Sequence, residues 1–225
     1  FMYYDNNQYN NTDYVGDDPD DVATNNVWDN NFKGVYHLHS SASPTKDSTS
    51  NNKDMTENAD PAYQQTGKIN DAVDFDGTDD SFDVSTIFAS GTTTVTIQAW
   101  AKTDTFTATQ CIASHGDNVQ GGINFINPST IEAAFIDGSW NWQFVQSTGY
   151  STGTWYHIVG TVQANNYVRL YVSGTEVGTA DAITTLLDAG TAYYAYIGGL
   201  PINNNGGNPN QDFDGIADEV RYSNV

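Results

Sequence analysis

Short runs in which apolar and polar residues alternate constrain the fold of this chain more than any other feature of its sequence. Between Thr94 and Lys102 every second side chain is apolar. Clusters of Gly, Asn, Asp and Ser separate such runs, as at Asn165-Asn166 and Ser173-Gly174. A period of two is that of a strand with one buried face, and these small polar residues favour tight turns. From Val27 onward the pattern predicts an all-β fold of two packed antiparallel sheets.

The charge of the chain excludes one class of partner. There are 28 acidic residues against 7 basic ones, which gives a formal net charge of -21. This charge would repel nucleic acid phosphates and anionic membrane surfaces, so no nucleic acid partner is expected. No apolar stretch is long enough to span a bilayer, so no membrane insertion is expected either. Most of the acid is Asp, which suits hard-cation sites, although an acidic salt-adapted surface explains the same numbers.

The amino-terminal segment differs from the rest of the chain. Residues 1–26 contain no Lys or Arg and carry Asp17-Asp18 and Asp20-Asp21. The opening Phe1-Met2-Tyr3-Tyr4-Asp5-Asn6 resembles the last strand of a separate small β-domain, or it is an ordinary edge strand of the same sandwich. We therefore expect an acidic extension over residues 1–26 and a β-sandwich over residues 27–225. The stretch 203–210, rich in Asn and Gly, is expected to be an exposed loop.

Several landmarks beyond Val27 resemble laminin-G-like domains of the concanavalin A-like lectin/glucanase superfamily. They follow one another in family order and are Gly34–Leu38, Gly67–Asp80, Ile97–Lys102, Gly153–His157, Leu170–Gly174, Tyr196–Gly199 and Phe213–Tyr222. The resemblance implies a two-sheet antiparallel jelly-roll β-sandwich. It also implies that Trp100 and Trp155 pack in the core and that His157 is structural.

A calcium site is the first candidate for bound chemistry. Calcium takes six to eight oxygen ligands, and Asp47 together with Asn51 or Asn52 offers carboxylate and amide oxygens on one polar loop. In the family such a loop often meets the Asp of the terminal Asp-Glu pair, which implies a site made of Asp47, Asn51, Asn52 and Asp218. The sequence departs from the family pattern because Lys53 and Asp54 stand where Gly is common. The alternative is that Asp47 and Asp218 only cap turns by accepting backbone amides.

A carbohydrate site would need an exposed aromatic platform, because the apolar face of a sugar ring stacks on an aromatic face. Strand periodicity places Trp140, Trp142 and Phe144 on one face of a strand and Asn141 and Gln143 on the other. Core packing is favoured for Trp142, and exposure for Trp140 beside the Asp137-Gly138 turn. The candidate ligand-binding residues are Trp140, Trp142, Tyr150 and Asn141.

The sequence gives little sign of catalysis. Only four Glu are present, and none belongs to the Glu-x-Asp-x-Glu string that retaining glycosidases of this architecture carry. There is no Gly-x-Ser-x-Gly elbow, and the single cysteine, Cys111, is expected to be buried in a strand. His37 and His39 share a strand face, but no third zinc ligand is near in sequence, so hydrogen-bonded histidines are favoured. We therefore expect a protein that is not an enzyme.

These observations predict a carbohydrate- or glycoprotein-binding adhesion module with possible calcium dependence. An extracellular or cell-surface location is favoured by the low Lys content and by the acceptor sequon Asn10-Asn11-Thr12. The alternative is a structural or assembly subunit of a cell-surface layer or filament, whose amino-terminal strand pairs with a neighbouring copy.

Overall fold

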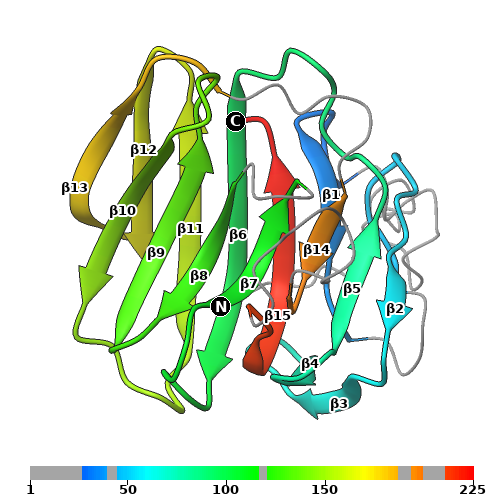
Figure 1. The fold of residues 1–225 in the computed structure, drawn as a ribbon. Coiled ribbons are helices and arrows are strands. Elements are labelled where there is room, and N and C mark those ends of the chain that lie inside the picture. The colour runs from blue at the N-terminus through cyan, green and yellow to red at the C-terminus, as the bar shows by residue number, and fades with distance from the viewer. Residues whose placement is uncertain (1–26, 40–44, 117–120, 187–193, 200–210) are drawn as a thin grey trace, which may run out of the picture.

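The computed structural model describes residues 27–39, 45–116, 121–186, 194–199 and 211–225. The expected strand at Phe1-Met2-Tyr3-Tyr4 and the expected loop at 203–210 lie outside these residues. The described part contains fifteen strands and no helix, and all of the strand pairs are antiparallel (Figure 1). The expected all-β class is thus confirmed.

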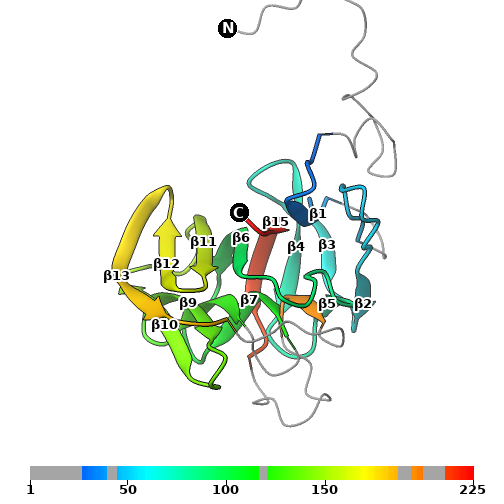
Figure 2. The same cartoon turned by 90° about the horizontal axis from the view of Figure 1, so that it is seen from above.

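Two sheets face each other across one core (Figure 2). The eight-stranded sheet contains, in spatial order, β13 (Thr175–Ile183), β12 (Asn166–Val172), β11 (Tyr156–Gln163), β6 (Thr94–Thr103), β15 (Asp214–Ser223), β4 (Asp71–Asp76) and β3 (Ala62–Thr66), with β1 (Phe32–Tyr36) also paired to β15. The seven-stranded sheet contains β10 (Trp142–Thr148), β9 (Thr130–Ile136), β8 (Gly121–Ile126), β7 (Gln110–His115), β14 (Ala195–Ile197), β5 (Ser81–Val84) and β2 (Thr56–Asn58).

Strand β6 forms as its alternation predicts. Val95, Ile97, Ala99 and Ala101 point into the core, and the residues between them are half-buried on the outer face of the sheet. Both expected turns are present, since Asn165 (φ 59°) connects β11 to β12 and the pair Ser173 (φ 50°) and Gly174 (φ 83°) connects β12 to β13. These positive φ values are those that Asn and Gly adopt most readily.

The last strand, β15, pairs with the first, β1, and so brings the two ends of the described chain side by side. One of its sides pairs with β6, while the other pairs first with β4 and then with β1. The register against β6 shifts between Asp218 and Arg221, and Glu219 has φ 52°, so the strand contains a β-bulge there. The bulge takes Asp218 and Glu219 out of the alternation that sends Ala217 and Val220 into the core.

The core is rich in aromatic side chains from both sheets. Phe75 of β4 makes an edge-to-face contact with Phe82 of β5, with ring centroids 5.7 Å apart, and contacts Phe213 at 5.9 Å. Tyr222 is fully buried and donates its hydroxyl to the carbonyl of Tyr196 at 2.7 Å. Such pairs add stability beyond the area that they bury, so the two sheets are fixed in one relative position.

Candidate functional site

An edge strand of the seven-stranded sheet exposes two large aromatic side chains. Trp142 and Phe144 of β10 are 43% and 48% exposed. Val145, which follows Phe144, is buried. The shared face of Trp142 and Phe144 was expected, but the preference for core packing of Trp142 is wrong. Side chains alternate along a strand. Because Val145 points inward, Phe144 and Trp142, which are one and three residues before it, point outward.

Trp140 lies just before β10 in a turn that one carboxylate organises. Asp137 Oδ1 accepts the amide hydrogens of Ser139 at 2.8 Å and Asn141 at 2.9 Å, and Asp137 Oδ2 lies 3.3 Å from the side-chain nitrogen of Gln143. These hydrogen bonds, the one from the Asn141 amide first, lower the pKa of Asp137. Trp140 is 65% exposed, so its expected exposure is confirmed. Its expected place on the strand beside Trp142 is wrong, because Trp140 has φ 65° and β10 begins only at Trp142.

A polar cluster that the sequence did not indicate lies beside the exposed aromatics. Glu132 of β9 accepts hydrogen bonds from Asn124 of β8 at 3.1 Å and from Gln146 of β10 at 2.7 Å. These three residues are directly opposite one another in the strand register. Only the register brings them together, and no motif in the sequence could have revealed it. Both side chains that donate to Glu132 are amides, so among the described residues these hydrogen bonds involve no second carboxyl group.

The structure separates Tyr150 from the other candidate ligand-binding residues. Trp140 precedes β10 and Tyr150 follows it, and a strand of seven residues is about 20 Å long. Tyr150 is half-buried and packs edge-to-face on Tyr156, with centroids 5.0 Å apart. Trp140, Asn141 and Trp142 are therefore brought together at one end of β10, and Tyr150 is not. The Asn141 side chain also points to Asp137, at 3.4 Å.

The carboxylate of Asp47 is fully used by the protein. It is buried and accepts hydrogen bonds from the amides of Val35, Thr49 and Lys53, each at 3.0 Å, and from the Thr49 hydroxyl at 2.8 Å. Asn51 donates to the carbonyls of Phe32 and Lys33, and Asn52 occupies a turn position with φ 51°. This pattern agrees with the alternative in which Asp47 caps the loop.

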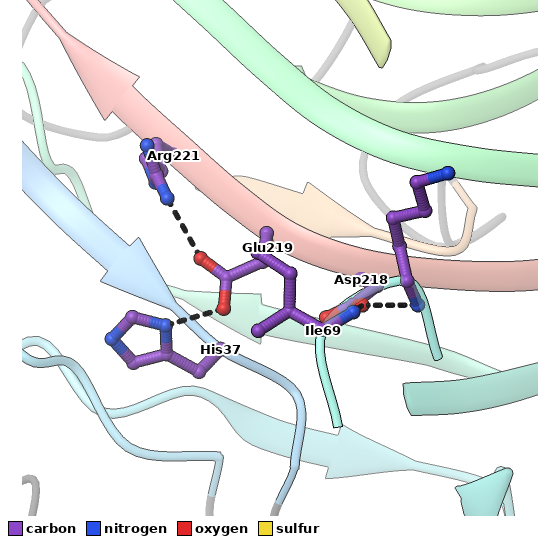
Figure 3. Close-up of polar contacts among 6 residues, drawn as sticks. His37, Ile69, Asp218, Glu219 and Arg221 are labelled. Carbon is purple, nitrogen blue, oxygen red and sulfur yellow. Dashed lines mark hydrogen bonds and ion pairs between the residues drawn. The ribbon is translucent and has the colours of Figure 1, made fainter. Parts of the chain in front are cut away.

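The Asp-Glu pair of β15 binds a different part of the chain. Figure 3 shows Asp218 directed at the β3–β4 turn, where its Oδ2 accepts the amides of Lys68 at 2.7 Å and Ile69 at 2.8 Å. Asp218 is fully buried, and its Oδ1 has no hydrogen-bond partner among the described residues. Asp47 and Asp218 thus stabilise two separate loops. Because Asp47 has no free oxygen, these residues do not fit a shared calcium ion, and calcium binding stays a prediction.

Glu219 lies between two basic side chains (Figure 3). His37 Nδ1 is 2.7 Å from Glu219 Oε1, and Arg221 donates to Oε2 at 2.8 Å. Burial acts to raise the pKa of Glu219, but these two partners hold it below its usual value. The rings of His37 and His39 stack at 5.8 Å. A hydrogen-bonded role for His37 is thereby confirmed.

Trp100 and Trp155 are not core residues, so their expected core packing is wrong. Both are half-buried on the outer side of the eight-stranded sheet, and Trp100 is one of the outward positions of β6. Lys68 lies 4.6 Å from the ring centroid of Trp100, and Lys102 lies 5.5 Å from that of Trp155. Family order placed Trp100 on a strand and Trp155 directly before one, but it did not determine which face of the sheet they lie on.

The buried cysteine has no catalytic environment. Cys111 is 1% exposed, and burial raises its pKa to about 12. The thiolate is the nucleophilic form, and a thiol with this pKa is almost entirely protonated at neutral pH. The expected burial of Cys111 is confirmed.

Acidic side chains gather at the turn after β4. In the described part of the chain, Asp76, Asp79 and Asp80 are the only three residues of ligand type whose side-chain atoms lie within 4.8 Å of one another. The two oxygens of Asp80 accept the amides of Asp60 and Asp76, at 3.1 Å and 3.0 Å. These hydrogen bonds account for Asp80 as a turn residue.

Burial of titratable groups predicts that the protein loses stability as the pH falls below neutral. Desolvation lowers the pKa of His115 from 6.5 to about 4. Between these two values the unfolded state binds a proton that the folded state does not, so stability falls as the pH falls. Desolvation also raises the pKa values of Asp74, Asp80, Asp212 and Asp218 above 3.8, which acts in the opposite direction. Because the shift of His115 is the larger one, the melting temperature should be lower at pH 5 than at pH 7. Differential scanning fluorimetry at constant ionic strength tests this, and a melting temperature that rises from pH 7 to pH 5 would contradict it.

Comparisons with known proteins agree on the class of fold. A laminin G-like family model, described as concanavalin A-like lectin/glucanases superfamily, matches residues 76–225. A search of curated protein sequences gave no match. Among solved structures, the chain is similar to the binding domain of Paraclostridial Mosquitocidal Protein 1, with a TM-score of 0.68 and 16% identity over 86% of this chain and 49% of that one.

Two further solved structures are informative. The botulinum neurotoxin serotype D binding domain gives a TM-score of 0.65 and 14% identity over 86% of this chain and 47% of that one. The other is domain 4 of AbnA, a GH43 extracellular arabinanase from Geobacillus stearothermophilus, in complex with arabinotriose. It gives a TM-score of 0.60 and 21% identity over 85% of this chain and 91% of that one. The chain spans about half the length of the toxin domains. At these identities the similarity shows the fold alone. Among the described residues no helix is long and apolar enough to cross a membrane.

Proposed function

The chain belongs to the laminin G-like family of the concanavalin A-like lectin/glucanases superfamily, and from this we propose that it is a module that binds carbohydrate or the glycan of a glycoprotein. We place its ligand at the aromatic end of β10, formed by Trp140, Trp142 and Phe144, and we refer to these three residues as the β10 platform. An adhesion role at the cell surface or outside the cell is part of the proposal.

The observation that carries the proposal is the exposure of the β10 platform. Its three side chains are 65%, 43% and 48% exposed, although large aromatic residues are usually buried in a sandwich. An aromatic face covers the apolar face of a sugar ring, and nearby polar groups bond to its hydroxyls. Gln146 is two residues after Phe144 and therefore lies on the same face of β10. It is exposed and donates to Glu132. The aromatic side chains of the platform thus suit the apolar face of a sugar ring, and the amide of Gln146 suits its hydroxyls.

Similar structures support binding as the class of function. The AbnA domain was solved with arabinotriose, and both clostridial structures are described as binding domains. The AbnA domain corresponds to the chain over most of its own length, whereas the toxin domains are about twice as long. The similarity to the AbnA domain therefore gives the more direct support for a saccharide ligand.

Truncating the β10 platform should weaken sugar binding at the platform without unfolding the protein. A glycan array identifies a ligand, and isothermal titration calorimetry then compares the wild type with Trp142→Ala and Phe144→Ala. Each variant should lose about five- to thirtyfold in affinity at the platform, because stacking on an exposed ring is worth on the order of 1–2 kcal/mol. Ile69→Ala, which truncates an equally exposed apolar residue on another loop, should leave affinity unchanged.

Two outcomes would contradict the proposal. One is binding that the Trp142 and Phe144 variants retain in full. The other is the absence of any binding to glycans, combined with concentration-dependent polymers that vanish when residues 1–26 are removed. That second result would favour the assembly-subunit alternative.

A further inference from the structure

Tyr167 lines two surface hollows on the face opposite to the β10 platform. One hollow has a volume of about 450 Å³ and is lined by Asn165, Asn166, Tyr167, Ala182, Ile183 and Thr184. The other has a volume of about 330 Å³, and its lining includes Thr94, Thr161, Gln163 and Arg169, as well as Asn166 and Tyr167. Both volumes lie in the range of small-molecule sites. Tyr167 is 42% exposed and lines both hollows, so its ring is open to a ligand in either of them.

The polar groups around Tyr167 are amides and hydroxyls. Asn166 donates its side-chain NH₂ to the side-chain oxygen of Gln163 at 2.8 Å. This bond leaves the Gln163 side-chain nitrogen and the Asn166 side-chain oxygen without partners among the described residues. One unused donor and one unused acceptor therefore lie next to an exposed aromatic ring. A sugar, with hydroxyls that both donate and accept, satisfies this combination.

The Tyr167 ring contacts the side chain of Arg169 on its own strand. The Arg169 guanidinium lies 5.2 Å from the ring centroid, and its Nη1 donates to Glu176 at 2.5 Å. This ion pair neutralises the charge beside the ring, so the hollows present no free charge to a ligand from Arg169 or Glu176. A Tyr side chain has few rotatable bonds, so ordering this ring on binding costs little side-chain entropy. The ligand that suits this ring is a neutral saccharide.

We propose that Tyr167 is the centre of a second, neutral-saccharide site, so that one copy of the chain binds two sugar chains. The inference rests on the proposed function of the β10 platform. Tyr167 lies on the outer face of the eight-stranded sheet, and Trp142 lies on the outer face of the seven-stranded sheet. The core separates these two faces, which look in opposite directions (Figure 2). A module with this arrangement cross-links polysaccharides without having to dimerise.

Calorimetric stoichiometry tests the second site. The probe is the neutral oligosaccharide that binds most tightly on a glycan array, and the wild type should bind two equivalents. The Tyr167→Ala variant should bind one equivalent. The double variant, Tyr167→Ala with Trp142→Ala, should bind none. Tyr167→Phe, which keeps the ring, should retain at least part of the second binding event. Ala182→Gln fills the 450 Å³ hollow from its exposed wall and provides an independent variant.

Turbidity of a soluble polysaccharide of the same sugar provides a second measurement. The wild type, shown to be a monomer by light scattering, should precipitate the polymer, whereas Tyr167→Ala and Trp142→Ala should each bind it without precipitation. One equivalent that Trp142→Ala abolishes and Tyr167→Ala leaves intact would overturn the second site and keep the proposed function. Failure of all glycans to bind would overturn both.

Discussion

Replacing Asp47 by alanine is expected to lower the free energy of unfolding by about 3–5 kcal/mol, whether or not calcium is present. The buried carboxylate accepts four hydrogen bonds, and they connect β1 to the loop that ends at Lys53. Alanine would leave three amides and one hydroxyl without an acceptor. Each buried group that loses its partner costs about 1–3 kcal/mol, and local relaxation with entry of water keeps the total below the simple sum.

Urea denaturation of the wild type, Asp47→Ala and Asp79→Ala measures this effect. Asp79 is exposed, so its removal should change stability by less than about 0.5 kcal/mol. If Asp47 only caps its loop, addition of a chelator should leave the melting temperature of the wild type unchanged. If calcium instead raises the melting temperature of the wild type but not of Asp47→Ala, the ion-binding role predicted from the sequence would be correct. A loss of less than 1 kcal/mol in Asp47→Ala would contradict the structural role.

Local pattern was sufficient for much of the fold. The alternation in β6 and the turns at Asn165 and Gly174 depend only on residues close in sequence, and all three were predicted. The β-bulge at Glu219 could not be predicted in this way. It lies where β15 changes its partner from β4 to β1, and these strands come from distant parts of the chain. Long-range pairing decides such features, and a single sequence does not encode them in any short window.

The candidate site shows the same limit in a different form. A period of two tells which side chains share a face, and it placed Trp142 with Phe144 correctly. It does not tell which face is covered, and this is why the preference for a buried Trp142 failed. Tyr167 and the Glu132 cluster were missed for a related reason. Their partners lie on neighbouring strands, and only the register of the folded sheet reveals them.

Gly198→Ala is expected to destabilise the protein by about 3 kcal/mol. Gly198 follows β14, has φ 88°, and donates its amide to the carbonyl of Ile112 at 2.9 Å. A Cβ atom at this position would lie 2.1 Å from the ring of Phe75, which is buried between Phe82 and Phe213. Left-handed backbone costs a non-glycine residue about 1–2 kcal/mol, and overpacking of a core costs about 1–3 kcal/mol more.

Gly174→Ala separates the cost of the left-handed backbone from the cost of overpacking, because Gly174 has nearly the same backbone conformation as Gly198. Gly174 has φ 83°, and no atom lies within 4 Å of the position that its Cβ would occupy. Its substitution should cost only about 1 kcal/mol in urea denaturation, and the difference from Gly198→Ala measures the collision with Phe75. Adding Phe75→Leu to Gly198→Ala should then be less costly than the sum of the two single changes, since the smaller side chain makes room for the methyl group. Equal losses in the two glycine variants would mean that backbone conformation alone requires Gly198, and that close packing against Phe75 does not.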